Sequence, residues 1–189
     1  MSRPAFGGGE LPAVFPDWSP YPDLETAARA YLRDPELALE ALDGVLGGMA
    51  PLSFTLERFV NEENGVWQEV AVCDGRRLVL WHGEDVSEGE GPAGAMTSSL
   101  RVVPLSSVIE VGCRRRLLRD DAGVLRVGSV DVYVLLSSLD EPHLVEEHPV
   151  ARHDALRFGK TLEDGGPGQI ARLEEFARVI TSRVGSSTG

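Results

Sequence analysis

Two tight-turn dipeptides constrain the fold of this chain more than any other feature of its sequence. Asn64-Gly65 and Asp74-Gly75 are typical of β-hairpin turns, and they separate short runs in which apolar and polar residues alternate. The runs cover residues 52–57, 66–73 and 77–82. Alternation with a period of two indicates a strand with one buried face. The sequence therefore predicts a three-stranded antiparallel meander whose first strand is half-buried.

Further strands are expected downstream, which brings the total to about seven. They are predicted at residues 100–105, 108–113, 127–136 and 155–159. Pro104 falls between two of them, where a missing amide donor does least harm to a sheet. Residues 84–95 are acidic and rich in glycine, so we expect a mobile, solvated loop there.

Helices are expected on both sides of the strand region. The first is predicted to begin at Pro22-Asp23, and the second has Asp34 as its N-cap, Pro35 in its first turn and Gly47-Gly48 at its end. Residues 165–168 are expected to break the chain before a final helix. The apolar stripe of that helix consists of Ile170, Leu173, Phe176, Ala177 and Ile180.

The order of these elements defines the expected organisation of the chain. Residues 1–20 form an arm rich in proline and glycine, 21–48 a helical hairpin, 52–184 a strand body with its closing helix, and 185–189 a tail. Aromatic residues in the arm, Phe15, Trp18 and neighbouring Tyr21, are expected to pin it to the body, although a partner-binding motif is an alternative. A bent seven-stranded sheet with one end plugged by a helix is the plan of the pleckstrin-homology-like barrel.

Short motifs carry a resemblance that agrees with this plan. The run 75–82 resembles the third strand of bacterial pleckstrin-homology-like domains, and 103–111 resembles their link into the next strands. From Tyr21 to Ile180 the chain is similar to an uncharacterised actinobacterial family, with matching motifs at 21–24, 45–48 and 156–158. The resemblance implies an α+β fold: a bent antiparallel barrel of about seven strands, two N-terminal helices and one C-terminal helix. Some members of that family are described as phosphodiesterases, but the motifs matched here are structural and not catalytic.

Composition and charge exclude several classes of function. The 189 residues carry a formal net charge of −12, which argues against nucleic-acid binding and against electrostatic docking on anionic lipid. No apolar stretch reaches the roughly 20 residues that span a bilayer, and the first ten residues lack the apolar core of a signal peptide. We therefore expect a cytoplasmic protein without membrane insertion. Cys73 and Cys113 are expected to be buried, reduced thiols, with a disulfide as the alternative.

Three histidines are the weak candidates for a metal site. His143, His148 and His153 lie near several carboxylates, and imidazole with carboxylate can bind zinc. Their spacing of five residues matches no common zinc motif. The favoured interpretation is a polar loop between strands. The alternative is a metal-dependent, phosphodiesterase-like hydrolase.

Four arginines within six positions stand out in this acidic chain. Arg114, Arg115, Arg116 and Arg119 carry guanidinium groups suited to phosphate or carboxylate. They are the candidate binding residues, for a small anion, a nucleotide or an acidic partner. The alternative is a strand end and turn neutralised by neighbouring aspartates. The first hairpin, residues 61–64, is acidic, which argues against inositol-lipid binding there.

Motifs of catalysis are missing from the sequence. The pattern G-x-S-x-G occurs only at residues 185–189, in the predicted tail and not at the turn between a strand and a helix, and the glycines at 165–168 lack the lysine of a phosphate-binding loop. We therefore expect no cofactor and favour a non-catalytic, cytoplasmic interaction or scaffold module with a protein partner. The sequence predicts neither that partner nor an oligomeric state.

Overall fold

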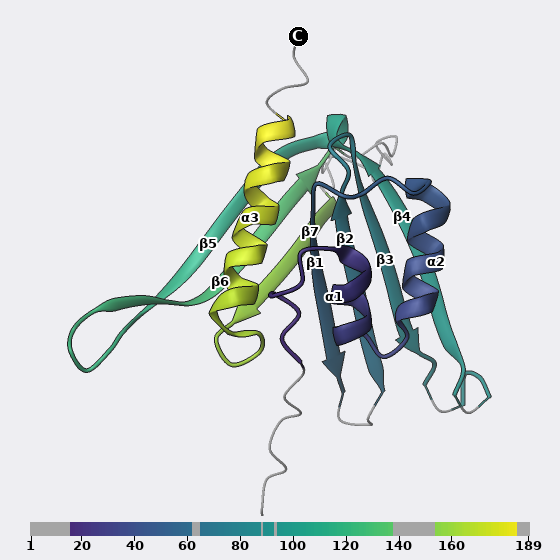
Figure 1. Ribbon diagram of the computed structural model, residues 1–189, viewed down its shortest axis with the longest axis horizontal. Coiled ribbons are helices and arrows are strands. Elements are labelled where there is room, and N and C mark those ends of the chain that lie inside the picture. Colours follow the sequence, from purple (N-terminus) through teal and green to yellow (C-terminus); the bar gives the residue numbers. More distant parts are fainter. Residues whose placement is uncertain (1–15, 62–64, 88, 93, 138–153, 185–189) are drawn as a thin grey trace, which may run out of the picture.

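The computed structural model describes residues 16–61, 65–87, 89–92, 94–137 and 154–184, and this part of the chain contains three α-helices and seven strands (Figure 1). The elements are α1 Leu24–Tyr31, α2 Pro35–Leu46, β1 Ser53–Val60, β2 Val66–Cys73, β3 Arg77–Asp85, β4 Met96–Pro104, the 3-10 turn η1 Leu105–Ser107, β5 Val108–Arg119, β6 Leu125–Leu136, β7 Asp154–Thr161 and α3 Gly166–Val184. The α+β class and the element order are as predicted.

The strands form two antiparallel sheets, with orders β1-β2-β3-β4 and β5-β6-β7. The meander predicted from the two turns is confirmed as β1-β2-β3. The expected barrel is not closed, because among the described strands β4 does not pair with β5, nor β7 with β1. Between β4 and β5 the chain passes through the turn η1, at the start of which Leu105 donates its amide to the Arg76 carbonyl at 2.8 Å.

Two cores lie on the two faces of the first sheet. Successive residues of β2 alternate between them: Val70 and Val72 pack beneath α1 and α2, whereas Ala71 and Cys73 pack toward α3 and the second sheet. The strand β1 is buried on both faces along its first half. The prediction that it is half-buried was wrong, since a helix covers each side of it. Leu52, expected in its buried set, is exposed before the strand begins.

Several elements are longer than predicted. The strand β3 continues to Asp85 and β4 begins at Met96, and the Val86 amide donates to the Ala95 carbonyl between them, so the acidic loop is shorter than expected. The strand β5 runs six residues past its predicted end. The helix α3 begins within the glycine segment, at Gly166, whose φ of +67° suits glycine.

The N-terminal segment is held to the body by Trp18. Its indole is fully buried, lies 5.6 Å from the Phe54 ring between centroids, and has the Arg172 guanidinium over its ring. This contact confirms the predicted anchoring by that residue, while Phe15 lies outside the described residues. Asp23 caps α1 by accepting from the Thr26 amide at 2.8 Å. Asp34 makes no such cap on α2, because its Oδ2 accepts from Arg33 and Gln68 instead.

Candidate functional site

The β5–β6 hairpin is the most prominent surface feature of the second sheet. Figure 1 shows it projecting sideways from the body as a two-stranded ribbon. The third strand, β7, pairs with β6 only as far as the Ser129–Thr161 pair, so beyond that point no other described strand pairs with the ribbon. All four candidate arginines lie on β5.

Strand geometry sends these arginines in different directions. Successive side chains of a strand point to opposite faces, so Arg115 lies on the face toward α3 and Arg114 on the outer face. Arg114 pairs with Asp131 at 3.2 Å, Arg115 with Glu174 at 2.5 Å, and Arg119 donates to the Gly123 carbonyl. The arginine set therefore does not converge on one anion-sized site, and its binding role stays a prediction.

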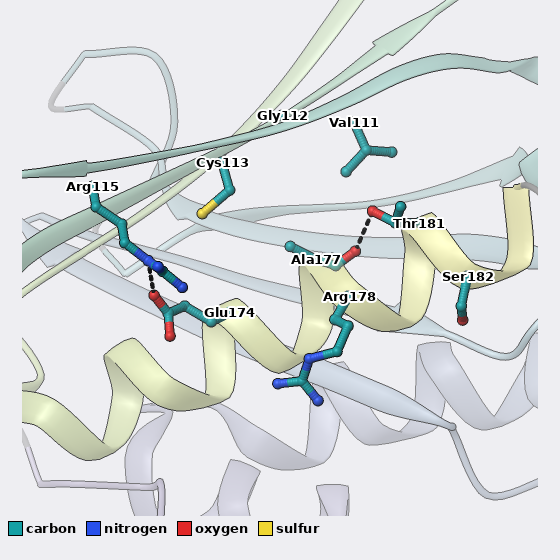
Figure 2. A pocket seen from close by; sticks show the side chains of 9 residues that line it. All are labelled: Val111, Gly112, Cys113, Arg115, Glu174, Ala177, Arg178, Thr181 and Ser182. Carbon is teal, nitrogen blue, oxygen red and sulfur yellow. Dashed lines mark hydrogen bonds and ion pairs between the residues drawn. The ribbon is translucent and has the colours of Figure 1, made fainter.

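A groove runs between β5 and α3. It has a volume of about 440 Å³ and is lined by Val111, Gly112, Cys113, Arg115, Glu174, Ala177, Arg178, Thr181 and Ser182. Figure 2 shows the β5 side chains facing the helix across this space, with the Arg115–Glu174 ion pair crossing one end. The Thr181 hydroxyl donates to the Ala177 carbonyl of its own helix at 2.8 Å. Its hydrogen-bond donor is therefore already used within α3.

Cys113 lies in this groove with an exposed side chain, whereas Cys73 is buried, and both are free thiols. The prediction that both are buried was wrong for Cys113. The inner residues of β6, Val130 and Val132, are fully covered, but α3 leaves the middle of β5 open. Desolvation beside the helix raises the pKa of the Cys113 thiol above its usual value. The thiol therefore lacks the lowered pKa that activates a cysteine nucleophile.

The outer face of β5 depends on a glycine. A Cβ at Gly112 would lie 1.9 Å from the Tyr133 ring, which crosses the strand at this point. The Tyr133 hydroxyl donates to Glu110 Oε1 at 2.8 Å, and this bond raises the pKa of the tyrosine. The aromatic ring thus covers a residue that has no side chain and ties β6 to the start of β5.

A buried ion pair joins the two sheets on the side of β1 and β7. Lys160 Nζ donates to Glu57 Oε2 at 3.0 Å and lies 5.5 Å from the centroid of the Tyr31 ring. The Lys160 side chain is fully buried. Burial raises the pKa of Glu57 to about 7 although Lys160 opposes the change, and it raises the pKa of Glu69, the cross-strand neighbour of Glu57, to about 7.

This pair escaped the sequence analysis, although a pattern points to it. Lys160 is two residues from buried Phe158 on the same strand, so it shares the core-facing side of β7. Neither the pair nor Glu69 lines the groove beside α3 or the hollow described next. We assign it a structural role.

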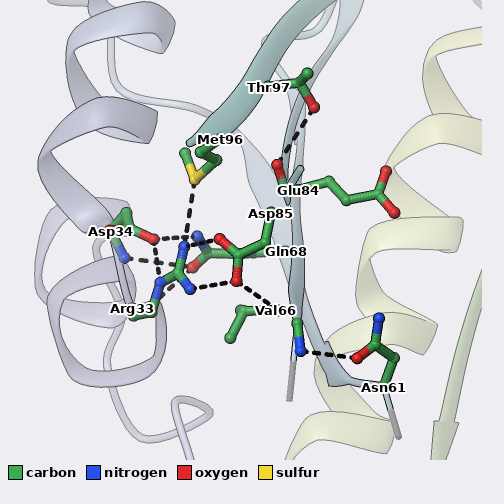
Figure 3. Close-up of polar contacts among 10 residues, drawn as sticks. Arg33, Asp34, Asn61, Val66, Gln68, Glu84, Asp85, Met96 and Thr97 are labelled. Carbon is green, nitrogen blue, oxygen red and sulfur yellow. Dashed lines mark hydrogen bonds and ion pairs between the residues drawn. The ribbon is translucent and has the colours of Figure 1, made fainter. Parts of the chain in front are cut away.

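A second hollow lies at the turn end of β1 and β2. Its volume is about 360 Å³, and its lining residues are Phe59, Asn61, Gly65, Val66, Trp67, Glu84 and Asp85. Phe59, Trp67 and Glu84 are opposite one another across β1, β2 and β3. The carboxylate of Asp85 is held by Arg33 at 2.6 Å, whereas Figure 3 shows the Glu84 side chain pointing away from that network.

The three candidate metal ligands His143, His148 and His153 lie outside the described residues. Within the described ranges, no three histidine, cysteine or acidic residues are grouped so that they could hold a metal ion. The metal-dependent hydrolase stays a prediction.

Among the described helices, none is both long and apolar enough to cross a membrane.

No protein-family model, curated protein or solved structure matches this chain. A functional proposal must therefore come from its own residues and their arrangement.

Proposed function

We propose that the protein is a non-catalytic, cytoplasmic interaction module that binds an extended segment of a partner protein between β5 and α3. One observation carries the proposal: β5 is an edge strand, paired only with β6 among the described strands, and its open side borders a groove. An extended peptide can pair with such an edge, so that main-chain hydrogen bonds supply affinity and side-chain contacts supply specificity. We further propose that the two sheets and α3 are an open variant of the pleckstrin-homology-like barrel, a proposal supported by the order of elements.

The length of regular strand suits this mode of binding. Register shifts interrupt the β5–β6 pairing between Val108 and Glu110 and again between Arg116 and Leu117. The seven residues 110–116 between them are regular, and at about 3.3 Å per residue they can pair with a peptide of similar length. A bound strand would place alternate side chains toward α3.

The lining of the groove indicates the chemistry of the partner. Val111 and Ala177 offer apolar surface, while Arg178 stands on α3 with no ion pair to any described residue. Arg116 also lacks an ion pair with any described residue, on the opposite face of β5. A segment that alternates apolar and acidic side chains therefore fits better than a basic one.

Arginines on an exposed edge strand have a second physical role. Charged side chains and bulges protect sheet edges from unwanted pairing, and β5 has both. Protection and recognition differ in one measurable way: only recognition requires a peptide to occupy the groove. A peptide in the groove would cover the exposed Cys113 thiol, so the rate at which this thiol reacts with a reagent measures occupancy. The Cys73 thiol is buried in the folded protein and therefore reacts at a different rate.

The test selects peptides from a random displayed library against the purified protein. Selected peptides are then added while Ellman's reagent reacts with Cys113. We expect peptides rich in apolar and acidic residues that slow the reaction at least several-fold. The variant Thr181→Arg, which fills the groove, should lose this binding. Glu40→Arg, on the exposed surface of α2, adds the same side chain elsewhere and should bind as the unchanged protein does.

Two results would contradict the proposal. The first is a selection that yields no binding peptide. The second is binding that leaves the Cys113 rate unchanged and survives Thr181→Arg, since it would place the ligand elsewhere on the protein.

A further inference from the structure

The hollow at the turn end of β1 and β2 has no part in the proposed function. Phe59, Trp67 and Glu84 are directly opposite one another on β1, β2 and β3. Opposite residues on neighbouring antiparallel strands have Cβ atoms about 5 Å apart and share one face of the sheet. The two aromatic rings and the carboxylate therefore line the hollow of about 360 Å³ as one row.

The rings in this row present aromatic surface to solvent. The Phe59 side chain is 60% exposed, although phenylalanine is among the residues most often buried. Trp67 is only partly buried, and its ring lies 5.3 Å from the His82 ring between centroids. The face of an aromatic ring is the negative part of its quadrupole and attracts a cation. The hollow therefore favours a positively charged ligand over an anion.

The charged residues of the hollow favour the same sign of ligand. Its lining contains two carboxylates and neither lysine nor arginine. Asp85 is engaged, because both of its oxygens accept from Arg33 at 2.6 Å and Oδ2 also accepts from the Val66 amide. Figure 3 shows the Glu84 side chain pointing away from that network. Its carboxylate lies 3.4 Å from the His82 ring and forms no ion pair with a described lysine or arginine.

The supply of hydrogen-bond acceptors narrows the class of cation. A primary ammonium donates three hydrogen bonds and a guanidinium donates five, and a hard metal ion takes several oxygen ligands. In this hollow Asp85 is engaged by Arg33, and Asn61 Oδ1 accepts from the Gly65 amide at 2.7 Å. A quaternary ammonium group donates no hydrogen bond. It needs only aromatic faces and a nearby negative charge, which Phe59, Trp67 and Glu84 supply.

We propose that the hollow binds an organic cation with a quaternary ammonium group, seated against the Phe59 and Trp67 rings with the Glu84 carboxylate as its counter-charge. A cation over the Trp67 ring, within about 6 Å of its centroid, lies beside both cross-strand neighbours of that residue. The hollow shares no lining residue with the groove beside α3. The proposal is therefore independent of the proposed function.

The first experiment titrates the protein with choline while the indole N–H signals of its tryptophans are followed by NMR. Trp18 and Trp81 are fully buried and serve as internal controls, whereas Trp67 lines the hollow. The variant Trp67→Phe identifies the Trp67 signal. We expect choline chloride to shift that signal in a saturable way, relative to sodium chloride at equal ionic strength. The neutral isostere 3,3-dimethylbutan-1-ol should bind about fivefold more weakly or less, because it lacks the charge.

The same group can also be carried by a protein, as trimethyllysine. A short peptide with one trimethyllysine is therefore titrated in parallel, with the unmethylated peptide as its control. Tighter binding of the methylated peptide than of choline would assign the cation to a protein partner, and the reverse order would assign it to a free small molecule. Either order supports the site.

Two variants test the residues of the row. Phe59→Leu keeps an apolar side chain without a ring, and Glu84→Gln keeps the shape of the side chain without its charge. Both residues are exposed, and thermal melting confirms that each variant folds. Each should weaken choline binding several-fold, whereas Phe59→Leu should change the binding of the neutral alcohol little. Glu40→Gln makes the same change on the exposed surface of α2 and should bind as the unchanged protein does.

Three results overturn the proposal. The first is a Trp67 signal that neither choline nor the methylated peptide shifts. The second is equal binding of choline and the neutral alcohol, since the hollow would then select apolar bulk and not charge. The third is binding that both variants leave unchanged, which would place the ligand elsewhere. If Phe59→Leu does not fold, Glu84→Gln decides the test. Peptide binding in the groove is measured at Cys113, so its failure and the failure of this proposal are read separately.

Discussion

The buried ion pair between Lys160 and Glu57 leads to the sharpest quantitative prediction. Lys160→Met keeps the length and most of the volume of the side chain but removes the charge. It leaves Glu57 Oε2 without its 3.0 Å partner, while Oε1 is already buried without a hydrogen-bond partner in the described part of the chain. Breaking a buried pair in this way typically costs about 3–5 kcal/mol when the remaining group stays charged.

The cost depends on pH, because Glu57 can take up a proton. Its pKa in the folded protein is about 7, above the ordinary value of 4.5, so the folded state holds a proton that the unfolded chain has lost. The contribution of this group to stability therefore falls as pH rises from about 4.5 to about 7. Below about pH 4.5, Glu57 is neutral in both proteins. Lys160→Met should then lower the free energy of unfolding by less than about 1 kcal/mol.

Above pH 7 the two proteins diverge. In the unchanged protein Glu57 ionises beside Lys160, whereas in the variant its pKa rises further because the attraction of the lysine is gone. The difference in unfolding free energy should grow by about 1.4 kcal/mol per pH unit and reach about 3 kcal/mol near pH 9. The burial of Glu69 acts in both proteins and largely cancels in the difference.

Urea unfolding of the two proteins at several pH values between about 5 and 9 measures this difference. The double variant Glu57→Gln, Lys160→Met is the control, since it has no carboxylate to ionise and should regain stability at high pH relative to Lys160→Met. Equal destabilisation by Lys160→Met at pH 6 and pH 9 would refute the reasoning. It would show that the lysine contributes through the packing of its aliphatic stem alone.

Three further substitutions test other contacts of the fold. Trp18→Ala empties a fully buried site and should cost about 3–5 kcal/mol in urea unfolding; a cost below about 1 kcal/mol would mean that the N-terminal segment does not anchor the body. Gly112→Ala should lower the melting temperature because its Cβ meets the Tyr133 ring, and adding Tyr133→Ala should recover part of the loss; no recovery would locate the strain elsewhere. Asp23→Ala should lower the melting temperature through the lost cap of α1, and Asp23→Ser should restore most of it.

The parts of the fold predicted correctly are those in which the burial of side chains produces a periodic pattern of apolar residues in the sequence. The apolar stripe of α3 and the alternation in β2 and β3 both arise because one or both faces of each element pack on a core. Residue types typical of tight turns predicted the connections between strands, as at Gly75, whose φ is +94°. Closure of the sheets was not predictable in this way, because pairing between distant strand edges leaves no periodic pattern in either strand.

The second half of β5 could not be predicted from such a pattern. Its second half, from Arg114 to Arg119, is held by backbone pairing with β6 and is exposed on both faces. A strand without a buried face has no reason to alternate, so its sequence does not indicate a strand. The four arginines were predicted as one cluster because they are close in sequence, but residues next to each other on a strand point to opposite sides.

The register shift between Arg116 and Leu117 divides β5 into two halves. A shift in register bends a strand and changes which side chains face its neighbours, and Gly128 opposite this point would clash with Leu118 if it carried a Cβ. On one side of the shift, β5 borders α3 and offers its edge; on the other side, the ribbon has left the body and offers its tip. A partner segment in the groove therefore contacts only the first half of the strand, and the half beyond the shift takes no part in the proposed function.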